Sequence, residues 1–74
     1  MSDVTNKVLA LSKPYLGPAA EQFLARQCKL FLKIEMSALT AANLKQLAGC
    51  YELGGRAIME PVKADELAKK IAAL

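Results

Sequence analysis

The segment Pro18–Met36, PAAEQFLARQCKLFLKIEM, sets the arrangement of the rest of the chain. On a helix, its polar residues fall within roughly 60° of arc. These residues are Gln22, Arg26, Lys29 and Lys33. Nearly all of the remaining circumference is apolar, so such a helix must be covered on two or three sides. We therefore expect the other segments to pack around residues 18–36.

The segments on either side also carry helical patterns. Residues 3–12 place apolar side chains at i, i+4 and i+7, and Pro14 is expected to end this helix near Ser12. Thr40 is the expected N-cap of a third helix that continues through two glycines to about Met59.

Pro61 is expected to end the third helix and to begin a fourth. The apolar stripe of this last helix consists of Ala64, Leu67, Ala68, Ile71 and Leu74. Oppositely charged residues four positions apart are expected to pair on the exposed faces. The pairs are Glu52–Arg56, Asp65–Lys69 and Glu66–Lys70.

These patterns predict an all-α fold, a small four-helix bundle in which residues 1–74 form a single helical domain. A central antiparallel helix pair, at about 18–36 and 40–59, is flanked by an N-terminal and a C-terminal helix. Pairing about a midpoint near residue 39 sets Phe23 and Leu24 level with Gly54-Gly55. The glycines are expected either to leave a gap for these side chains or to act as a hinge.

Size and composition limit the functional classes. The 74 residues are 54% hydrophobic and carry a net charge of +3. A chain this short has a barely sufficient core of its own, so burial against a second copy or a partner is favoured. No apolar run approaches the ~20 residues of a membrane-spanning helix, and the expected location is the cytoplasm.

Catalytic and metal-binding signals are weak. The chain has no histidine, and its acidic residues are scattered, so neither an enzyme nor a cofactor is expected. Cys28 and Cys50 lie level in the predicted helix pair, where a disulfide is geometrically conceivable. Two buried free thiols are the favoured reading, because free cysteines are commonly buried.

The polar stripe of Gln22, Arg26, Lys29 and Lys33 is the first candidate binding site. Its three cations suit phosphates, an acidic protein surface or lipid headgroups. The alternative is an ordinary solvated edge whose long side chains cover apolar neighbours.

A candidate interface consists of Gln27, Leu32 and Leu53. Gln27 falls inside the apolar arc, where a buried amide needs a hydrogen-bond partner. The Tyr51 hydroxyl is one candidate, and Gln27 of a second copy across a dimer axis is another. Leu53 points away from the main apolar face of its helix, and Leu32 lies on the flank of the 18–36 helix.

These features predict a small non-enzymatic module for protein interaction, regulation or assembly, which self-associates as a homodimer or docks on a partner protein. The alternative is a nucleic-acid-binding protein that uses the basic stripe on the 18–36 helix.

Overall fold

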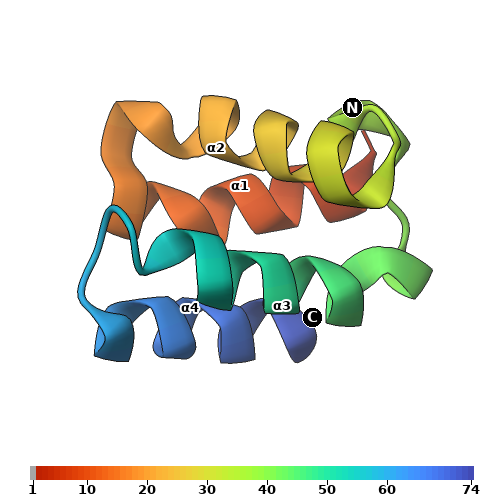
Figure 1. Ribbon diagram of the computed structural model, residues 1–74. Coiled ribbons are helices and arrows are strands. Elements are labelled where there is room, and N and C mark those ends of the chain that lie inside the picture. Colours follow the sequence, from red (N-terminus) through yellow and green to blue (C-terminus); the bar gives the residue numbers. More distant parts are fainter. Residues whose placement is uncertain (1) are drawn as a thin grey trace.

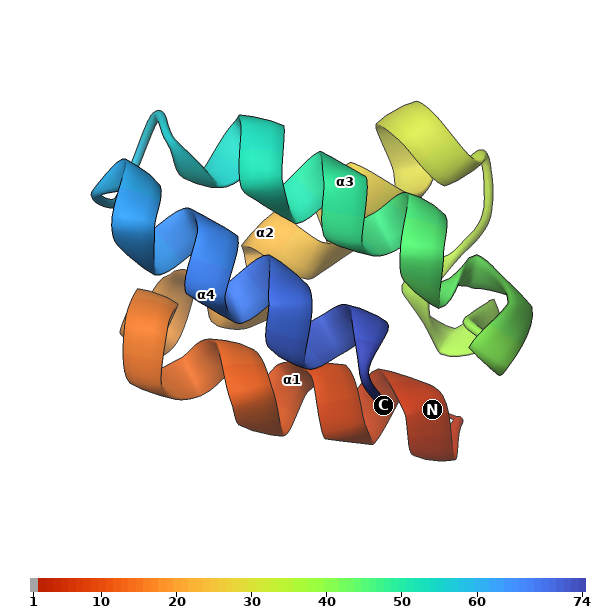
Figure 2. The ribbon, with the colours of Figure 1, turned by 90° about the horizontal axis from the view of Figure 1, so that it is seen from below.

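The computed structural model describes residues 2–74 and contains four α-helices. These are α1 (Asp3–Leu16), α2 (Ala20–Gln27), α3 (Leu44–Gly55) and α4 (Pro61–Ala72). Shorter helical turns join them: η1 (Gly17–Ala19), η2 (Cys28–Leu32), η3 (Met36–Ala38) and η4 (Ala41–Asn43). Successive α-helices run antiparallel (Figure 1), and α4 packs against both α3 and α1 (Figure 2). The predicted all-α helical bundle is confirmed.

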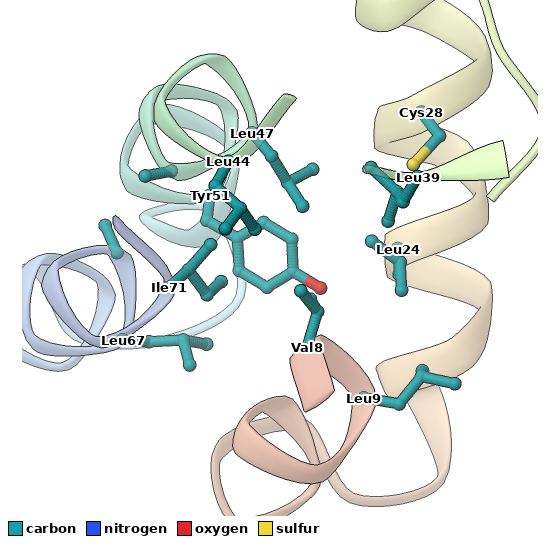
Figure 3. Close-up of a cluster of buried hydrophobic side chains, with 12 residues drawn as sticks. Val8, Leu9, Leu24, Cys28, Leu39, Leu44, Leu47, Tyr51, Leu67 and Ile71 are labelled. Atoms are coloured by element: carbon teal, nitrogen blue, oxygen red, sulfur yellow. The ribbon is translucent and has the colours of Figure 1, made fainter. Parts of the chain in front are cut away.

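Tyr51 of α3 lies in the middle of the core, and its ring reaches toward α1 (Figure 3). Its hydroxyl is 3.0 Å from Ser12 Oγ, and Ser12 Oγ donates its own proton to the Val8 carbonyl over 2.7 Å. Tyr51 therefore donates to Ser12, because a serine hydroxyl has only one proton to give. Of the two candidate partners for Gln27, the Tyr51 hydroxyl is thus excluded, because it donates to Ser12 on α1.

Residues from all four helices surround Tyr51, and Leu39 joins them from the segment between α2 and α3. The fully buried apolar side chains are Val8, Leu24, Leu39, Leu47, Leu67 and Ile71. In the last helix the predicted stripe is buried from Ala64 to Ile71, but Leu74 is exposed because the helix has already ended.

The most extensive helix packing is between α3 and α4, and Gly55 makes their close approach possible. A Cβ added at Gly55 would lie 3.1 Å from Ala64 Cβ and 3.3 Å from Met59 Cε. Gly54 faces the other way: a Cβ there would lie 3.4 Å from Phe23 Cζ. The predicted packing of Phe23 against the glycine pair is thus confirmed at Gly54. At Gly55 the prediction is wrong, because this glycine faces α4.

Helix α3 ends at Gly55, four residues before the predicted end at Met59. Turn hydrogen bonds replace the helical pattern there, with Ile58 N–H and Met59 N–H both donating to the Gly55 carbonyl. The chain reverses direction in this turn. Helix α4 then begins at Pro61 and packs against Gly55.

Helix α1 continues through Pro14 to Leu16, so the predicted end near Ser12 is wrong. Pro14 lacks the N–H that would donate to the carbonyl of Ala10. Both residues lie on the exposed face, where water can replace that hydrogen bond. The helix instead ends at Gly17, whose φ of 57° and N–H bond to the Lys13 carbonyl form a glycine C-cap.

The single helix predicted over 18–36 is also wrong at its C-terminal end. After α2, residues Cys28–Leu32 form the π-helical turn η2. Lys33 then adopts a left-handed conformation with a φ of 61°. The chain leaves the helix at Lys33, because a left-handed residue cannot continue a right-handed helix.

The segment from Lys33 to Asn43 folds back over the core and fills the space between α2 and α3. Leu39 is only 1% exposed and lies beside Leu24 and Cys28 (Figure 3). Side chains at the start of α1 hold its backbone: Ser2 Oγ donates to the Leu39 carbonyl over 2.8 Å, and Thr5 Oγ1 donates to the Met36 carbonyl. This connection is therefore a part of the core.

Thr40 begins the next helical segment, as predicted. Its backbone N–H donates to Asn43 Oδ1 over 3.0 Å, which is half of a capping box. The three predicted ion pairs are also present, at 3.6 Å for Glu52–Arg56, 3.1 Å for Asp65–Lys69 and 3.6 Å for Glu66–Lys70.

Buried ionisable groups predict that the fold loses stability in alkali. Burial, and to a lesser extent the neighbouring Cys50, raises the pKa of Cys28 from 9.0 to about 11. Burial also raises the pKa of Tyr51 from 10.0 to about 12, against the opposing hydrogen bond to Ser12. The unfolded chain therefore releases these protons at lower pH than the folded chain. The stability that they contribute is complete below about pH 9 and is lost as the pH rises toward 12.

Urea unfolding followed by circular dichroism at several pH values measures this loss. We expect the urea concentration at the unfolding midpoint to decrease as the pH rises from about 9 to 11. The decrease should be less steep for Cys28→Ala than for the wild type. Lysine titration affects both proteins alike and cancels in the comparison. Equal slopes for the two proteins would contradict the raised pKa of Cys28.

Candidate functional site

A groove of about 350 Å³ lies between the α2–η2 segment and the C-terminal end of α3. We call it the α2–α3 groove. Its lining includes Phe23, Gln27, Leu30, Phe31, Gly54 and Ile58. Gly54 lets α3 approach α2 closely here, since a Cβ on it would lie 3.2 Å from Gln27 Nε2 and 3.4 Å from Phe23 Cζ.

The walls of the α2–α3 groove are apolar and open to solvent. Leu30 is 49% exposed, Phe31 is 56% exposed and Ile58 is 55% exposed. Single exposed apolar residues are ordinary, but three large ones around one hollow form a patch that typically marks an interaction site.

Leu53 extends this apolar surface along α3. It is 74% exposed and precedes Gly54 directly, and Ala57 follows it at i+4. Ala57 lines the groove from the turn after α3, whereas Leu53 is not part of the lining.

The amide of Gln27 forms the polar part of the floor. The residue is only 6% exposed, and its Oε1 has no hydrogen-bond donor. The amide is pressed against α3, since a Cβ at Gly54 would lie 3.2 Å from Nε2 and 3.3 Å from Oε1. A buried carbonyl oxygen without a donor costs about 1–3 kcal/mol, and because this oxygen has no accessible surface, a group entering the groove cannot reach it unless Gln27 moves.

Phe23 supports the floor from the core side. Its ring meets the Tyr51 ring edge-to-face, with centroids 4.9 Å apart and an interplanar angle of 86°. Because the Ser12 hydrogen bond fixes Tyr51 in turn, the inner wall of the groove rests on rigid core residues.

The predicted basic stripe reaches the groove only at Arg26. Gln22, Arg26, Lys29 and Lys33 are all exposed, and Arg26 also lines the groove. Within residues 2–74, neither Arg26 nor Lys29 nor Lys33 takes part in an ion pair. Their charges are therefore free to meet a partner.

The structure brings part of the predicted site together. Gln27 and Arg26 line one groove, and Leu53 adjoins it, whereas Leu32 is partly buried and packs against the core. Sequence reasoning missed Leu30, Phe31 and Ile58 as surface residues. Ile58 falls within the longer helix predicted to Met59, but in the structure it lies in the turn after Gly55.

Other sites offer less. Cys28 is buried, Cys50 is half-buried, and both are free thiols. Over residues 2–74 there is no cluster of three or more histidine, cysteine or acidic residues able to hold a metal ion. Nor is any helix in that range sufficiently long and apolar to cross a membrane.

A larger hollow of about 550 Å³ lies between α1 and α4, beside Tyr15. Its tyrosine is satisfied: the Tyr15 hydroxyl donates to Glu66 Oε1 over 3.0 Å and accepts from Lys70 Nζ over 2.8 Å. It lacks the buried unpartnered group of the α2–α3 groove, so the α2–α3 groove is the stronger candidate.

No protein-family model, curated protein or solved structure was found to match this chain. Its function therefore has to be inferred from the chemistry of the groove itself.

Proposed function

We propose that the protein is a non-enzymatic interaction module that binds a partner protein in the α2–α3 groove. The observation that carries this proposal is the apolar rim, where Leu30, Phe31 and Ile58 are open to solvent around one hollow. Apolar walls supply affinity when they are covered, and a single polar group at the centre fixes orientation.

A protein partner fits this groove better than a small molecule. The volume of about 350 Å³ is near the lower end of ligand pockets, which span roughly 300–1,000 Å³. The hollow is open, and the surrounding apolar surface continues over Leu53 and Ile58. Covering the rim as well as the hollow requires a surface larger than that of a small ligand.

Comparative retention by immobilised protein tests this function. Wild type, Phe31→Ser and Val62→Ser are exposed to extract from the source cells, and the retained proteins are compared. Val62 is also a large apolar residue on the surface, but it does not line the groove, so Val62→Ser is the matched control. We expect a partner that the wild type and Val62→Ser retain and Phe31→Ser loses.

The affinity of the purified partner is then measured by calorimetry. Burial of one large apolar side chain contributes about 1.5–3 kcal/mol, so Phe31→Ser should weaken binding by about tenfold or more. Identical retention and affinity for all three proteins would remove the groove as the binding site. A second copy of the chain as partner would appear as a dimer in sedimentation equilibrium.

Nucleic-acid binding is the second candidate, favoured by the exposed and unpaired cations of the basic stripe. Binding through Arg26, Lys29 and Lys33 would release counterions, so affinity for a labelled oligonucleotide would fall steeply between about 50 and 200 mM salt. Apolar binding in the groove would change little over the same range.

A further inference from the structure

We propose that the π-helical turn η2 is a two-state element that opens and closes the α2–α3 groove by a register shift of one residue. The structure holds η2 in its π form, in which Leu32 packs against the core and Phe31 lines the groove. In a second, α-helical form, Phe31 takes the place of Leu32 on the core. This inference rests on the proposed function and adds a regulatory device to the same site.

The buried residues before η2 show which side chain an α-helix would bury next. Leu24 and Cys28 are fully buried and lie four positions apart on the inner face of the segment. Residues at i, i+4 and i+7 share one face of an α-helix, so Phe31 would continue that face. Phe31 is instead 56% exposed, and Leu32, one residue later, packs against the core. The inner face thus slips by one residue within η2.

The hydrogen bonds of η2 account for this slip. Lys33 N–H donates to the Cys28 carbonyl, five residues back, and Ile34 N–H donates to the same carbonyl over 3.2 Å. An α-helical turn would instead pair the Cys28 carbonyl with the N–H of Leu32. A π turn takes in one residue more than an α turn, so each later side chain points where an α-helix would direct its predecessor.

The π form carries two local costs that a continuing α-helix would not carry. Lys33 ends the turn with a φ of 61°, a conformation that is unfavourable for a residue with a side chain. The phenyl ring of Phe31 also stays half in solvent, although the burial of a large apolar side chain is favourable. Backbone strain of this kind persists only where the surrounding structure holds it in place.

The connection between α2 and α3 supplies that restraint. Leu39 is buried beside Cys28 (Figure 3), and its carbonyl accepts from Ser2 Oγ over 2.8 Å. The Met36 carbonyl is also bonded to the start of α1. These contacts favour an exit of the chain from the helix at Lys33, whereas the local costs favour a longer α-helix. Opposing contributions of this kind keep a second conformation populated.

The register shift removes one wall of the α2–α3 groove. Phe31 lines the groove together with Gln27, four residues before it. In the α form the phenyl ring turns from the groove to the inner face of the segment. A partner that contacts Phe31 therefore binds the π form, and its apparent affinity falls with the fraction of molecules in that form. Any change that shifts η2 toward the α form closes the site.

Two tryptophan probes in the free protein test the shift, because the chain has no tryptophan of its own. Phe31→Trp and Leu32→Trp each place an indole at one of the exchanging positions, and acrylamide quenching measures its exposure. Each probe is combined with Lys33→Gly, which relieves the left-handed strain, and with Lys33→Ile, whose branched side chain increases it. Lys29→Ile is the matched control, because Lys29 is also exposed but has a negative φ.

The two probes are expected to respond in opposite directions. Glycine and isoleucine at position 33 should differ about tenfold in the ratio of π form to α form. The quenching constant of Phe31→Trp should therefore be lower with Lys33→Ile than with Lys33→Gly, by about twofold or more, and that of Leu32→Trp should be higher. Lys29→Ile should leave both constants unchanged. Stronger quenching of both probes with Lys33→Ile would mean that the segment frays, and unchanged quenching would mean a single form; either result overturns the two-state element.

Fluorine NMR provides a second measurement without a change of probe residue. The chain has two phenylalanines, so 4-fluorophenylalanine gives two signals, and Phe23 is the internal reference because its ring packs on Tyr51. Exchange between the two forms should broaden or split the Phe31 signal, and Lys33→Gly should restore one sharp line. A Phe31 signal as sharp as that of Phe23 in both proteins would overturn the shift.

Both measurements use the free protein, so their outcome is separate from that of the retention comparison. A partner that Phe31→Ser loses, together with probes that do not respond to Lys33, would leave the proposed function standing and remove its regulation by η2. If the shift occurs and the partner binds, Lys33→Gly should bind at least as tightly as the wild type and Lys33→Ile more weakly. Equal affinity of the two variants would overturn the role of η2 in closing the groove.

Discussion

Leu39→Ala is expected to lower the free energy of unfolding by about 2–5 kcal/mol, the usual range for truncating a fully buried leucine. Leu39 is 1% exposed and lies against Leu24 and Cys28 in the core (Figure 3). A domain of this size has little stability in reserve, so a loss in the upper part of this range would leave much of the protein unfolded at room temperature.

The expected loss is large because the surrounding backbone cannot easily close the cavity. The Leu39 carbonyl accepts from Ser2 Oγ, and the Met36 carbonyl accepts from Thr5 Oγ1. Both donors belong to the start of α1, which is fixed in the bundle. Cavities that cannot collapse carry the highest cost among leucine truncations.

Urea unfolding followed by circular dichroism measures this effect, with Leu53→Ala as the control. Leu53→Ala removes the same atoms from an exposed position on α3, so it should change the free energy of unfolding by no more than about 0.5 kcal/mol. If the two variants unfolded at the same urea concentration, the connection between α2 and α3 would be a surface loop and not part of the core.

The role of this connection could not be predicted from sequence. Ile34 and Met36 continue the apolar spacing of the preceding helix, so periodicity alone extends that helix to residue 36. Nothing in the sequence marks Lys33 as left-handed, because glycine and asparagine are the usual residues there. Thr5 looks like a surface residue, and only the folded chain shows its hydrogen bond to the connection.

Elements that depend on local signals were predictable. Pro61 begins α4, Thr40 begins the turn that leads into α3, and three ion pairs form at i, i+4 spacing. Caps, prolines and charge pairs act over one helical turn, so their effects are visible in a short window of sequence.

The candidate site was predictable in its polar part and not in its apolar part. The exposure of Gln22 and Arg26 and the burial of Gln27 both follow from the helical pattern of α2. Leu30 and Phe31, however, lie in the π turn η2, where i→i+5 bonding turns residues away from their α-helical directions. Which acceptor the Tyr51 hydroxyl would donate to depended on the position of α1, because its partner is Ser12 Oγ at 3.0 Å.

The second large effect is expected at Gly55. Gly55→Leu should lower the free energy of unfolding by about 3 kcal/mol, because a side chain there enters the most tightly packed helix pair. Even a Cβ would lie 3.1 Å from Ala64 Cβ and 3.3 Å from Met59 Cε, and leucine adds three more carbon atoms. The Met59 methyl can move aside because it ends a flexible side chain. The Ala64 methyl is bonded directly to the backbone of α4, so it can move only if the helix moves.

Gly49→Leu is the matched control, because Gly49 lies in the same helix and a Cβ there would have no neighbour within 4 Å. Helix propensity alone predicts that leucine stabilises both positions by up to about 1 kcal/mol. We therefore expect opposite signs for the two variants in urea unfolding. Stabilisation of both would show that α4 does not press on Gly55.

A methyl exchange tests the contact itself. Gly55→Ala places a methyl group against Ala64, and Ala64→Gly removes the methyl that it would meet. If the two helices are held at this distance by these residues, the double variant should be more stable than the sum of the single effects predicts, by about 0.5–3 kcal/mol. Strict additivity would mean that α3 and α4 can separate slightly at no cost, and the large penalty expected for Gly55→Leu would then have no steric cause.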